Sequence, residues 1–320
     1  MRKMAGMTGM AVAAILLLAA GMAQADTITR TITHGSTTIN MDFVTVGNAG
    51  NTGEVQSQGT FGAVAYEYKI GKYEVTAAQW AAVIVADSAV GNAGNWIGSQ
   101  PTAGTSWNEA AKFCNWLTTG SATSGYYTIS GGAASTNALS HDAYAAANGT
   151  TYFIPTEDEW YKAAYHKNNG VTGGAANYWD YPTGSDTMPM AVTGGTGAGT
   201  AVFYGNGVSP TAPAVVNNAG GLSAYDTMGQ GGNVWEWNEA ILYGSDRGLR
   251  GGSFGDHHDG LHASNRDIYF GYPTHESYYI GFRVSEVPEP ASMAVLALGS
   301  IGMLLRRRFG FAHRKRGLGR

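Results

Sequence analysis

Five side chains that can bind metal ions lie within seven residues near the C-terminal end of the chain. Asp256, His257, His258 and Asp259 are consecutive, and His262 follows three residues later. Imidazole and carboxylate groups bind zinc, iron or nickel in proteins. The stretch therefore has two interpretations: a metal centre that serves an enzyme through Asp256, His257, His258 and His262, or a polar surface loop. The polar loop is the simpler of the two.

The chain has one cysteine, Cys114, so it cannot form an internal disulfide. Ser106, followed three residues later by Glu109, fits the capping box at the start of a helix. This helix would carry apolar residues three and four positions apart, at Ala110, Phe113, Cys114 and Leu117. Cys114 is therefore predicted to be a small buried residue rather than a nucleophile.

Two further helices are predicted from their capping residues. Thr76 is placed to cap a helix over 77–83, and Thr156 is placed to cap a second one. The acids Glu157–Glu159 fill the first turn of the second helix, where the helix dipole favours negative charge. They are predicted to be helix-start residues rather than catalytic acids. The arginines that are expected to pair with acids inside the fold are Arg250, Arg266 and Arg283.

Alternating apolar residues predict strands over 42–46, 59–73 and 279–284. Between them, 120–151 is predicted to be an inserted surface loop or weak hairpin, and 168–222 shows little periodicity. The 47 glycines, 18 tyrosines and 8 tryptophans indicate many turns between aromatic-packed segments. No internal repeat or linker divides the region, so one domain is predicted.

The N-terminal segment 1–25 has the pattern of a secretory signal peptide. Two basic residues precede the uncharged run 10–20, and Ala23 and Ala25 form a small-x-small cleavage site. The alternative, a retained membrane anchor, needs a longer apolar run. Signal peptidase is therefore an expected processing partner.

The C-terminal segment 287–310 combines a proline motif, an apolar run over 291–305 and an arginine cluster, and a basic tail follows over 311–320. The run is short for a membrane-spanning helix, but flanking arginines can extend it, and they favour the cytoplasmic side. This order resembles the PEP-CTERM sorting signal, which implies transient anchoring in the inner membrane and cleavage by an exosortase. The residues that carry the resemblance are Pro288, Glu289, Pro290, Arg306, Arg307 and Arg308.

The region between these two ends is acidic. Residues 26–290 contain all 23 Asp and Glu but only ten of the 19 Lys and Arg, for a net charge of −13. Such a region repels nucleic acid and anionic lipid, so neither is expected as a partner. The charge is compatible with Ca²⁺ or a cationic partner, although solubility alone also accounts for it.

A series of short motifs follows in one order from Asp42 to Val284. Together they resemble the formylglycine-generating enzyme family, also called the sulfatase-modifying factor domain. The resemblance implies an α+β fold over 42–285, a single C-type-lectin-like domain with little regular secondary structure, after a lead-in over 26–41. The motifs are Tyr73-Glu74-Val75-Thr76, Ser106-Trp107, Asn115-Trp116-Leu117, Pro155-Thr156-Glu157, Gly232-Asn233-Val234-Trp235-Glu236-Trp237, Arg250-Gly251-Gly252-Ser253-Phe254 and Gly281-Phe282-Arg283-Val284.

The resemblance also implies an active site, and this sequence departs from it. Active members carry two cysteines, five residues apart, after the Gly-Gly-Ser motif. These cysteines bind copper and oxidise a substrate cysteine to formylglycine. The corresponding positions here are Asp256 and Leu261. Cuprous copper needs thiolate ligands, so neither copper nor the oxidase reaction is expected, and no catalytic residue is assigned.

The resemblance implies a structural calcium site at the Gly-Asn-Val-Trp-Glu-Trp motif. The carbonyl groups of Gly232 and Val234 and the carboxylate of Glu236 would bind the ion, while a fourth ligand position falls on Gly229. Ca²⁺ accepts carbonyl and water oxygens, so the site is weakened rather than excluded. The alternative is that Glu236 is a buried carboxylate bonded to backbone amides.

Two functions are consistent with these patterns. The first is a non-catalytic binding or structural module, exported to the cell surface or extracellular matrix, whose long loops contact extracellular polysaccharide or an envelope protein. The second is an enzyme, either a metal-dependent one or a residual formylglycine-generating-type oxidase. It would use the cluster Asp256, His257, His258 and His262.

Overall fold

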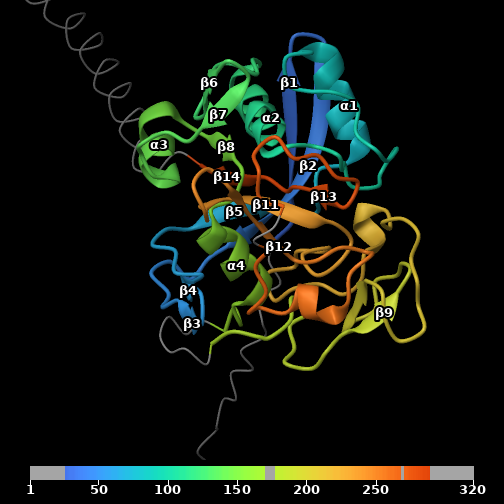
Figure 1. Ribbon diagram of the computed structural model, residues 1–320. Coiled ribbons are helices and arrows are strands. Elements are labelled where there is room, and N and C mark those ends of the chain that lie inside the picture. Colours follow the sequence, from blue (N-terminus) through green and yellow to red (C-terminus); the bar gives the residue numbers. More distant parts are fainter. Residues whose placement is uncertain (1–25, 170–176, 268–269, 289–320) are drawn as a thin grey trace, which may run out of the picture.

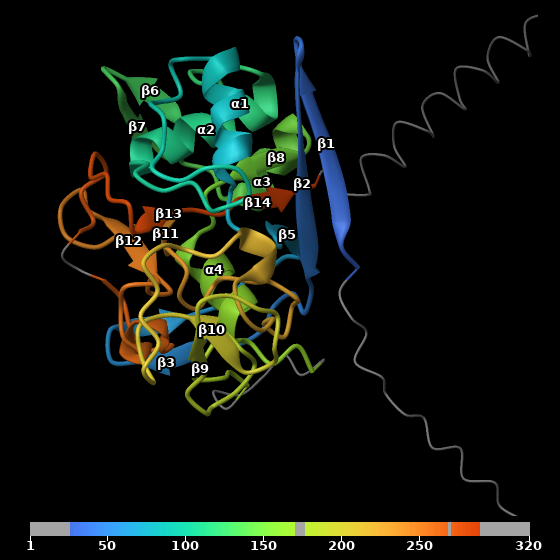
Figure 2. The same ribbon diagram turned by 90° about the vertical axis from the view of Figure 1, so that its right-hand side faces the viewer.

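The first two strands form a long antiparallel hairpin along one side of the molecule (Figure 2). In the computed structural model, which describes residues 26–169, 177–267 and 270–288, β1 (Ile28–His34) pairs with β2 (Thr37–Val46) along its whole length. Apolar residues such as Ile32 and Met41 face the core, and threonines alternate with them on the exposed face. Most of the lead-in expected over 26–41 is therefore part of the main sheet, and the folded domain begins at Ile28.

The main sheet joins the two ends of the domain (Figure 1). Its order is β1-β2-β5-β14-β8, and all neighbouring strands are antiparallel. Strand β14 (Ser285–Val287) lies between β5 (Tyr68–Gly71) and β8 (Thr151–Phe153). The region predicted as one strand over 59–73 contains β4 (Gly59–Phe61), which pairs with β3 (Glu54–Gln56), and β5.

The three predicted helices are confirmed, and each begins at its predicted capping residue. They are α1 (Ala77–Ala86), α2 (Trp107–Thr119) and α4 (Glu157–Tyr165), and all three have complete capping boxes. Cys114 is fully buried in α2, as predicted, and burial raises the pKa of its thiol well above the ordinary value. The hairpin alternative for 120–151 is confirmed by β6 (Thr128–Ser130) and β7 (Ala133–Ser135), whereas the helix α3 (His141–Asn148) in the same region was not predicted.

A smaller sheet positions the motifs of the second half of the chain. Strand β11 (Trp235–Ile241) lies between β12 (Arg247–Arg250), which is antiparallel to it, and β13 (Ile280–Gly281), which is parallel. The strand predicted over 279–284 therefore contains only the two-residue β13, and β14 follows separately. In the described part of 168–222, which leaves out 170–176, the regular elements are the parallel pair β9 (Met190–Val192) and β10 (Thr200–Val202) and the short helix η1 (Val216–Asn218).

The predicted signal segment 1–25, the apolar run 291–305 and the basic tail 311–320 lie outside the described residues, as do Glu289 and Pro290. Within the described residues, no helix is long and apolar enough to cross a membrane.

Candidate functional site

Strand β11 presents its side chains to two different environments. Trp235 lies beside Ile280 of β13, and its indole Nε1 donates a hydrogen bond to Asp256. Glu236, the next residue, points to the opposite face, where it meets Arg283 in the interior. Because successive side chains of a strand point to opposite faces, a half-exposed site at Trp235 lies next to a fully buried site at Glu236.

A tight glycine turn follows β12 and delivers the polar residues to Trp235. Gly251 and Gly252 have φ values of +100° and +73°, and a Cβ on Gly251 would lie 2.7 Å from the carbonyl oxygen of Gln230. Glycine is the residue that tolerates both the conformation and the close approach. The turn places Ser253 next to Asp256, which explains why the Gly-Gly-Ser motif precedes the site.

Asp256 is held by three neutral donors that all bond to one carboxylate oxygen. Its Oδ2 accepts hydrogen bonds from Trp235 Nε1 at 2.8 Å, from the backbone N–H of Ser253 at 3.0 Å and from the Ser253 hydroxyl at 2.5 Å. Among the described residues, no donor bonds to Oδ1. One oxygen of Asp256 thus fixes the orientation of the carboxylate and the other is left for a ligand or solvent.

The half-buried Asp256 lines a cavity of about 300 Å³. The cavity lies between the glycine turn and the segment that leads into β13. Its lining combines aromatic rings and an aliphatic side chain with the polar groups of serine, aspartate, histidine and tyrosine. The lining residues are Trp235, Ser253, Gly255, Asp256, Phe270, His275, Ser277, Tyr279 and Ile280.

Leu261, the residue predicted to stand at the second family cysteine position, is part of the core. It is fully buried in an apolar cluster with Tyr181 and Phe203, and it ends the short helix η2 (His258–Leu261). A carboxylate held by Trp235 and a buried alkyl side chain provide no thiolate at either position. The residues present at Asp256 and Leu261 do not fit a cuprous ion.

The three histidines of the cluster point to different partners. His257 contacts the ring of Tyr204 with 4.9 Å between centroids, and His258 Nε2 lies 3.1 Å from Asp259. His262 bonds through Nδ1 to the Ser264 hydroxyl at 2.8 Å. In the part of the chain that the structure describes, no group of three His, Cys, Asp or Glu is placed to hold a metal ion. The polar loop therefore agrees better with the geometry than the metal centre does.

Glu236, the proposed calcium ligand, forms a buried ion pair. Its Oε2 accepts hydrogen bonds from Arg283 Nε at 2.6 Å and Trp160 Nε1 at 2.7 Å, and its Oε1 accepts one from Arg283 Nη2 at 2.6 Å. Both Glu236 and Arg283 are fully buried. These donors are side chains, not the backbone amides that the sequence alternative expected. This set fits a guanidinium partner better than it fits a calcium ion beside Gly232 and Val234.

Chelation decides between a calcium ion bound by Gly232, Val234 and Glu236 and the ion pair with Arg283. Because Arg283 already neutralises Glu236, we expect EDTA to shift the thermal midpoint of the domain by less than about 2 °C. Metal analysis of the dialysed protein should find no tightly held calcium. One equivalent of calcium, together with a large loss of stability in EDTA, would contradict this expectation and assign a structural ion.

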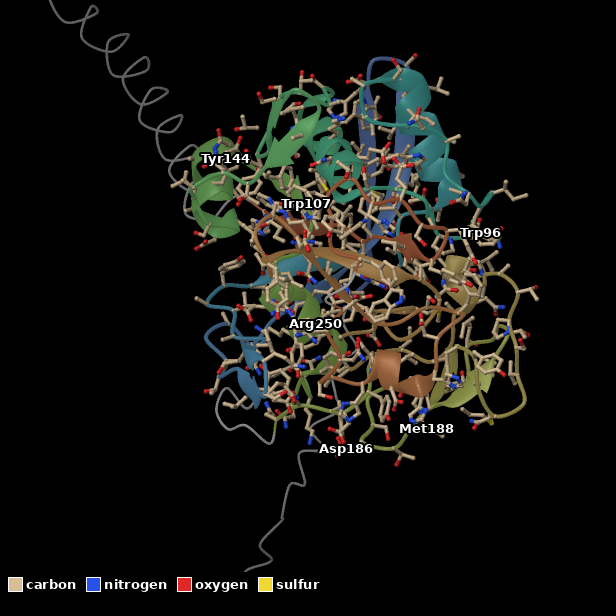
Figure 3. The ribbon with its side chains drawn as sticks, in the orientation of Figure 1. Trp96, Trp107, Tyr144, Asp186, Met188 and Arg250 are labelled. Atoms are coloured by element: carbon tan, nitrogen blue, oxygen red, sulfur yellow. The ribbon has the colours of Figure 1, made fainter. Side chains whose placement is uncertain are left out.

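The other two arginines also pair with acids, as the sequence predicted. Arg250 bonds to Glu157 at 2.7 Å and to the carbonyl oxygen of Asn265 at 2.7 Å, and Arg266 pairs with the second oxygen of Glu157. Figure 3 shows Arg250 in the interior of the molecule. Since Glu157 is the first residue of α4, these contacts fasten the segment after η2 to that helix.

Sequence reasoning missed most of the cavity. Trp235 and Tyr279 were assigned to a motif and to a strand, and His275 and Ser277 carried no signal at all. Gly255, the residue before Asp256, was the one local signal of the cavity, because a Cβ at this position would lie 2.7 Å from the Tyr279 ring. A glycine next to a family active-site position marks a close contact there, but only the fold shows which ring makes it.

Comparison with solved structures places the fold. The chain is similar to Treponema denticola variable protein 1, with a TM-score of 0.54 and 22% identity over 82% of this chain and 99% of the other. It is also similar to CarF, with a TM-score of 0.56 and 22% identity over 78% and 99%. At these identities the likeness shows the fold alone. No curated protein matches the chain.

Two family matches account for nearly all of the described chain and for part of the tail. Residues 286–308 match the PEP-CTERM protein-sorting motif, which implies export and recognition by an exosortase. Residues 28–287 match the sulfatase-modifying factor enzyme 1-like domain. The second match spans the five-stranded sheet, the glycine turn and the cavity at Asp256, and the chain therefore belongs to the sulfatase-modifying factor enzyme 1-like family.

Proposed function

We propose that this chain is an exported binding module that uses the family fold without the family oxidation. The observation that carries the proposal is the state of Asp256. At the position where the family resemblance implies a reactive thiol, this chain has a carboxylate that three donors bond. The second implied thiol position is occupied by the buried Leu261. A site built to orient a carboxylate next to aromatic rings favours recognition of a ligand.

The proposed path of the protein follows from its two ends. Signal peptidase would cleave after Ala25, and the apolar run 291–305 would hold the chain in the inner membrane until an exosortase cleaves near the proline motif. The domain would then reach the cell surface or the extracellular matrix. The acidic charge and the absence of an expected nucleic-acid partner are compatible with that destination.

The binding role is assigned to the cavity at Asp256 rather than to the long loops alone. Loops carry recognition when a rigid frame holds them. Here the frame is the smaller sheet, since Trp235 and Ile280 are register partners in neighbouring strands. An envelope protein or an extracellular polysaccharide would be the partner.

An activity and metal assay tests the proposal. Residues 26–290 contain every helix and strand of the described fold, so this fragment is the protein to purify. We expect no oxidation of a cysteine peptide in the presence of copper and oxygen, and no stoichiometric copper, iron or zinc after dialysis against a weak chelator. An active family member serves as the positive control.

A positive result would identify an enzyme instead. Copper-dependent formation of formylglycine would contradict the proposed function. So would one equivalent of a transition metal that is lost in the His257→Ala variant but kept in a variant of a histidine away from the cluster, such as the half-buried His34→Ala. Either result would indicate an active site at Asp256 and the histidine loop.

A further inference from the structure

The carboxylate of Asp256 carries a charge that the fold does not neutralise. Its three donors are uncharged groups of Trp235 and Ser253, and in the described part of the chain no lysine or arginine forms an ion pair with it. By contrast, Glu157, Glu236 and Glu286 each pair with an arginine. Among the described residues, Asp256 therefore lines its cavity without an arginine or lysine partner.

The rest of the cavity is mostly apolar. The side chains of Trp235, Tyr279 and Ile280 line it, while His275, Ser277 and the hydroxyl of Tyr279 are the remaining side-chain polar groups that are not already bonded to Asp256. A sugar ring needs several hydrogen-bond partners, whereas a flexible alkyl chain with one charged head needs one carboxylate and an apolar wall. The cavity offers the second combination.

An exposed aromatic surface extends from the cavity. Tyr279 contacts Tyr278 with 4.0 Å between ring centroids, and Tyr278 contacts Trp96 at 6.4 Å. Tyr278 is 47% exposed, and Ile97, the residue that follows Trp96 in the chain, is 80% exposed. Figure 3 shows Trp96 at the edge of the molecule, far from the buried Arg250. Aromatic rings around an anchoring pocket are typical of protein interfaces.

We propose that the cavity binds a lysine side chain of a protein partner. The ammonium group would bond to Asp256 Oδ1, and the alkyl stem would pack against Trp235, Tyr279 and Ile280. The rings of Tyr278 and Trp96 would contact the partner around this lysine. The inference rests on the proposed function, because it takes the Asp256 cavity as the ligand site. The net charge of −13 over 26–290 would attract a basic partner surface.

A series of small probes tests the charge requirement on the unsubstituted fragment 26–290. Nα-acetyl-lysine methylamide carries the ammonium, Nα,Nε-diacetyl-lysine methylamide removes its charge, and Nα-acetyl-norleucine methylamide removes the head group. D-glucosamine places an ammonium on a sugar. Trp235 lines the cavity, so tryptophan fluorescence reports binding, and calorimetry measures it. We expect the lysine probe to bind at least about tenfold more tightly than either neutral probe.

A matched pair of variants locates the site. Asp256→Asn keeps the shape of the side chain but removes its charge, and we expect it to lose at least about tenfold in affinity for the lysine probe. Asp259→Asn removes a charge three residues away, on a side chain that is 82% exposed and outside the cavity, and should leave the affinity unchanged. Thermal unfolding of each variant checks the fold.

Each other outcome overturns the inference. Equal binding of the charged and neutral probes would show an apolar pocket, and preferential binding of glucosamine would show an amino-sugar site. In both cases the cavity would remain a ligand site and the proposed function would stand. Absence of binding by every probe would also overturn the inference, whereas the proposed function itself fails only if the oxidation or metal assay is positive. The probe series decides the question even if Asp256→Asn does not fold.

Discussion

Replacement of Arg283 by methionine is expected to destabilise the domain by about 3–5 kcal/mol, which is a loss of roughly 10 °C in thermal midpoint for a domain of this size. The guanidinium bonds to both oxygens of Glu236, to the carbonyl oxygen of Gly71 at 2.8 Å and to that of Met228 at 2.9 Å. Methionine fills similar space without the charge. The variant would leave the carboxylate of Glu236 buried without its cation.

A second buried acid increases this cost. Glu74 accepts a hydrogen bond from Asn233 at 2.8 Å, and its other oxygen has no hydrogen-bond partner among the described residues. Burial raises the pKa of Glu74 to about 7, and the charge of Arg283 acts in the opposite direction. Without Arg283, Glu74 and Glu236 would be two buried acids that no cation stabilises.

The matched control is Arg30→Met. Arg30 also bonds to a buried glutamate, Glu286, at 2.6 and 2.7 Å, but its side chain is 35% exposed and Lys69 lies 3.7 Å from the same carboxylate. We expect this variant to lose about 1 kcal/mol or less. Urea unfolding measures the loss of stability in Arg283→Met and in Arg30→Met. Equal losses in the two variants, or a melting point of Arg283→Met near that of the unsubstituted protein, would contradict the prediction.

The same variant gives a sharper test of calcium. If Gly232, Val234 and Glu236 can hold an ion once the guanidinium is gone, calcium chloride should restore stability to Arg283→Met but not to Arg283→Met combined with Glu236→Gln. We expect no restoration, because the backbone around Glu236 is arranged for the ion pair.

Replacement of His141 by glutamine is expected to destabilise the domain by several kcal/mol near pH 6.5 and by much less at pH 10. His141 is buried between two acids, with Nδ1 3.1 Å from Glu159 and Nε2 3.1 Å from Glu239. Burial alone would lower the pKa of His141, but the two carboxylates outweigh it and raise the pKa to about 10. The protonated ring is thus the stable form in the folded protein.

The sign of the pH effect follows from that shift. The unfolded ring has a pKa of about 6.5, so the stability that His141 contributes is fully present below about pH 6.5 and is lost as the pH rises through about 10. The full shift corresponds to about 5 kcal/mol. The two carboxylates are themselves bonded to tyrosines, with Tyr66 on Glu159 and Tyr127 on Glu239. The network links α3 and α4 to β11.

Denaturant unfolding of the unsubstituted protein and of the His141→Gln variant at pH 6.5, 8 and 9.5 measures the contribution of His141 to stability. The difference between the two proteins is the quantity to follow, because Lys162 acts in the opposite direction. Burial lowers the pKa of Lys162 to about 8, so its contribution to stability rises between about pH 8 and 10 in both proteins. The exposed His258→Gln variant is the control. A difference that stays constant across the pH range would show that His141 acts only by packing.

Local signals predicted the helices well. The capping boxes at Thr76, Ser106 and Thr156 depend on residues three positions apart, and they form in the fold as the sequence indicates. The burial of Cys114 followed from its place on the apolar face of α2. These predictions hold because the interactions involved are completed within one or two helical turns.

The sheet was harder to predict. Strand β1 consists largely of threonines alternating with a few apolar residues, and it was expected to be a lead-in. It forms a strand because it pairs antiparallel with β2 over seven residue pairs. Strand β14 has three residues, and its partners β5 and β8 lie far away in the sequence. Pairing at such separation leaves no local pattern.

The candidate site divides in the same way. The motif series predicted that Asp256 and Leu261 occupy the two positions of the family cysteines, and this correspondence stays a prediction. The sequence also determined the acidic charge of the region and the order of residues in the sorting motif. It paired the arginines with acids in general but did not say which acid each one meets.

Only the tertiary structure decided what surrounds these residues. It directed the three histidines to separate partners, placed Arg283 against the presumed calcium ligand Glu236, and brought Trp235 and Tyr279 around Asp256. His258 and His262 meet partners one and two residues away, whereas the contacts of His257, Arg283 and Asp256 join segments that are distant in sequence. The sequence therefore determined which chemical groups the protein carries, and the packing of the two sheets determined which of them can act together.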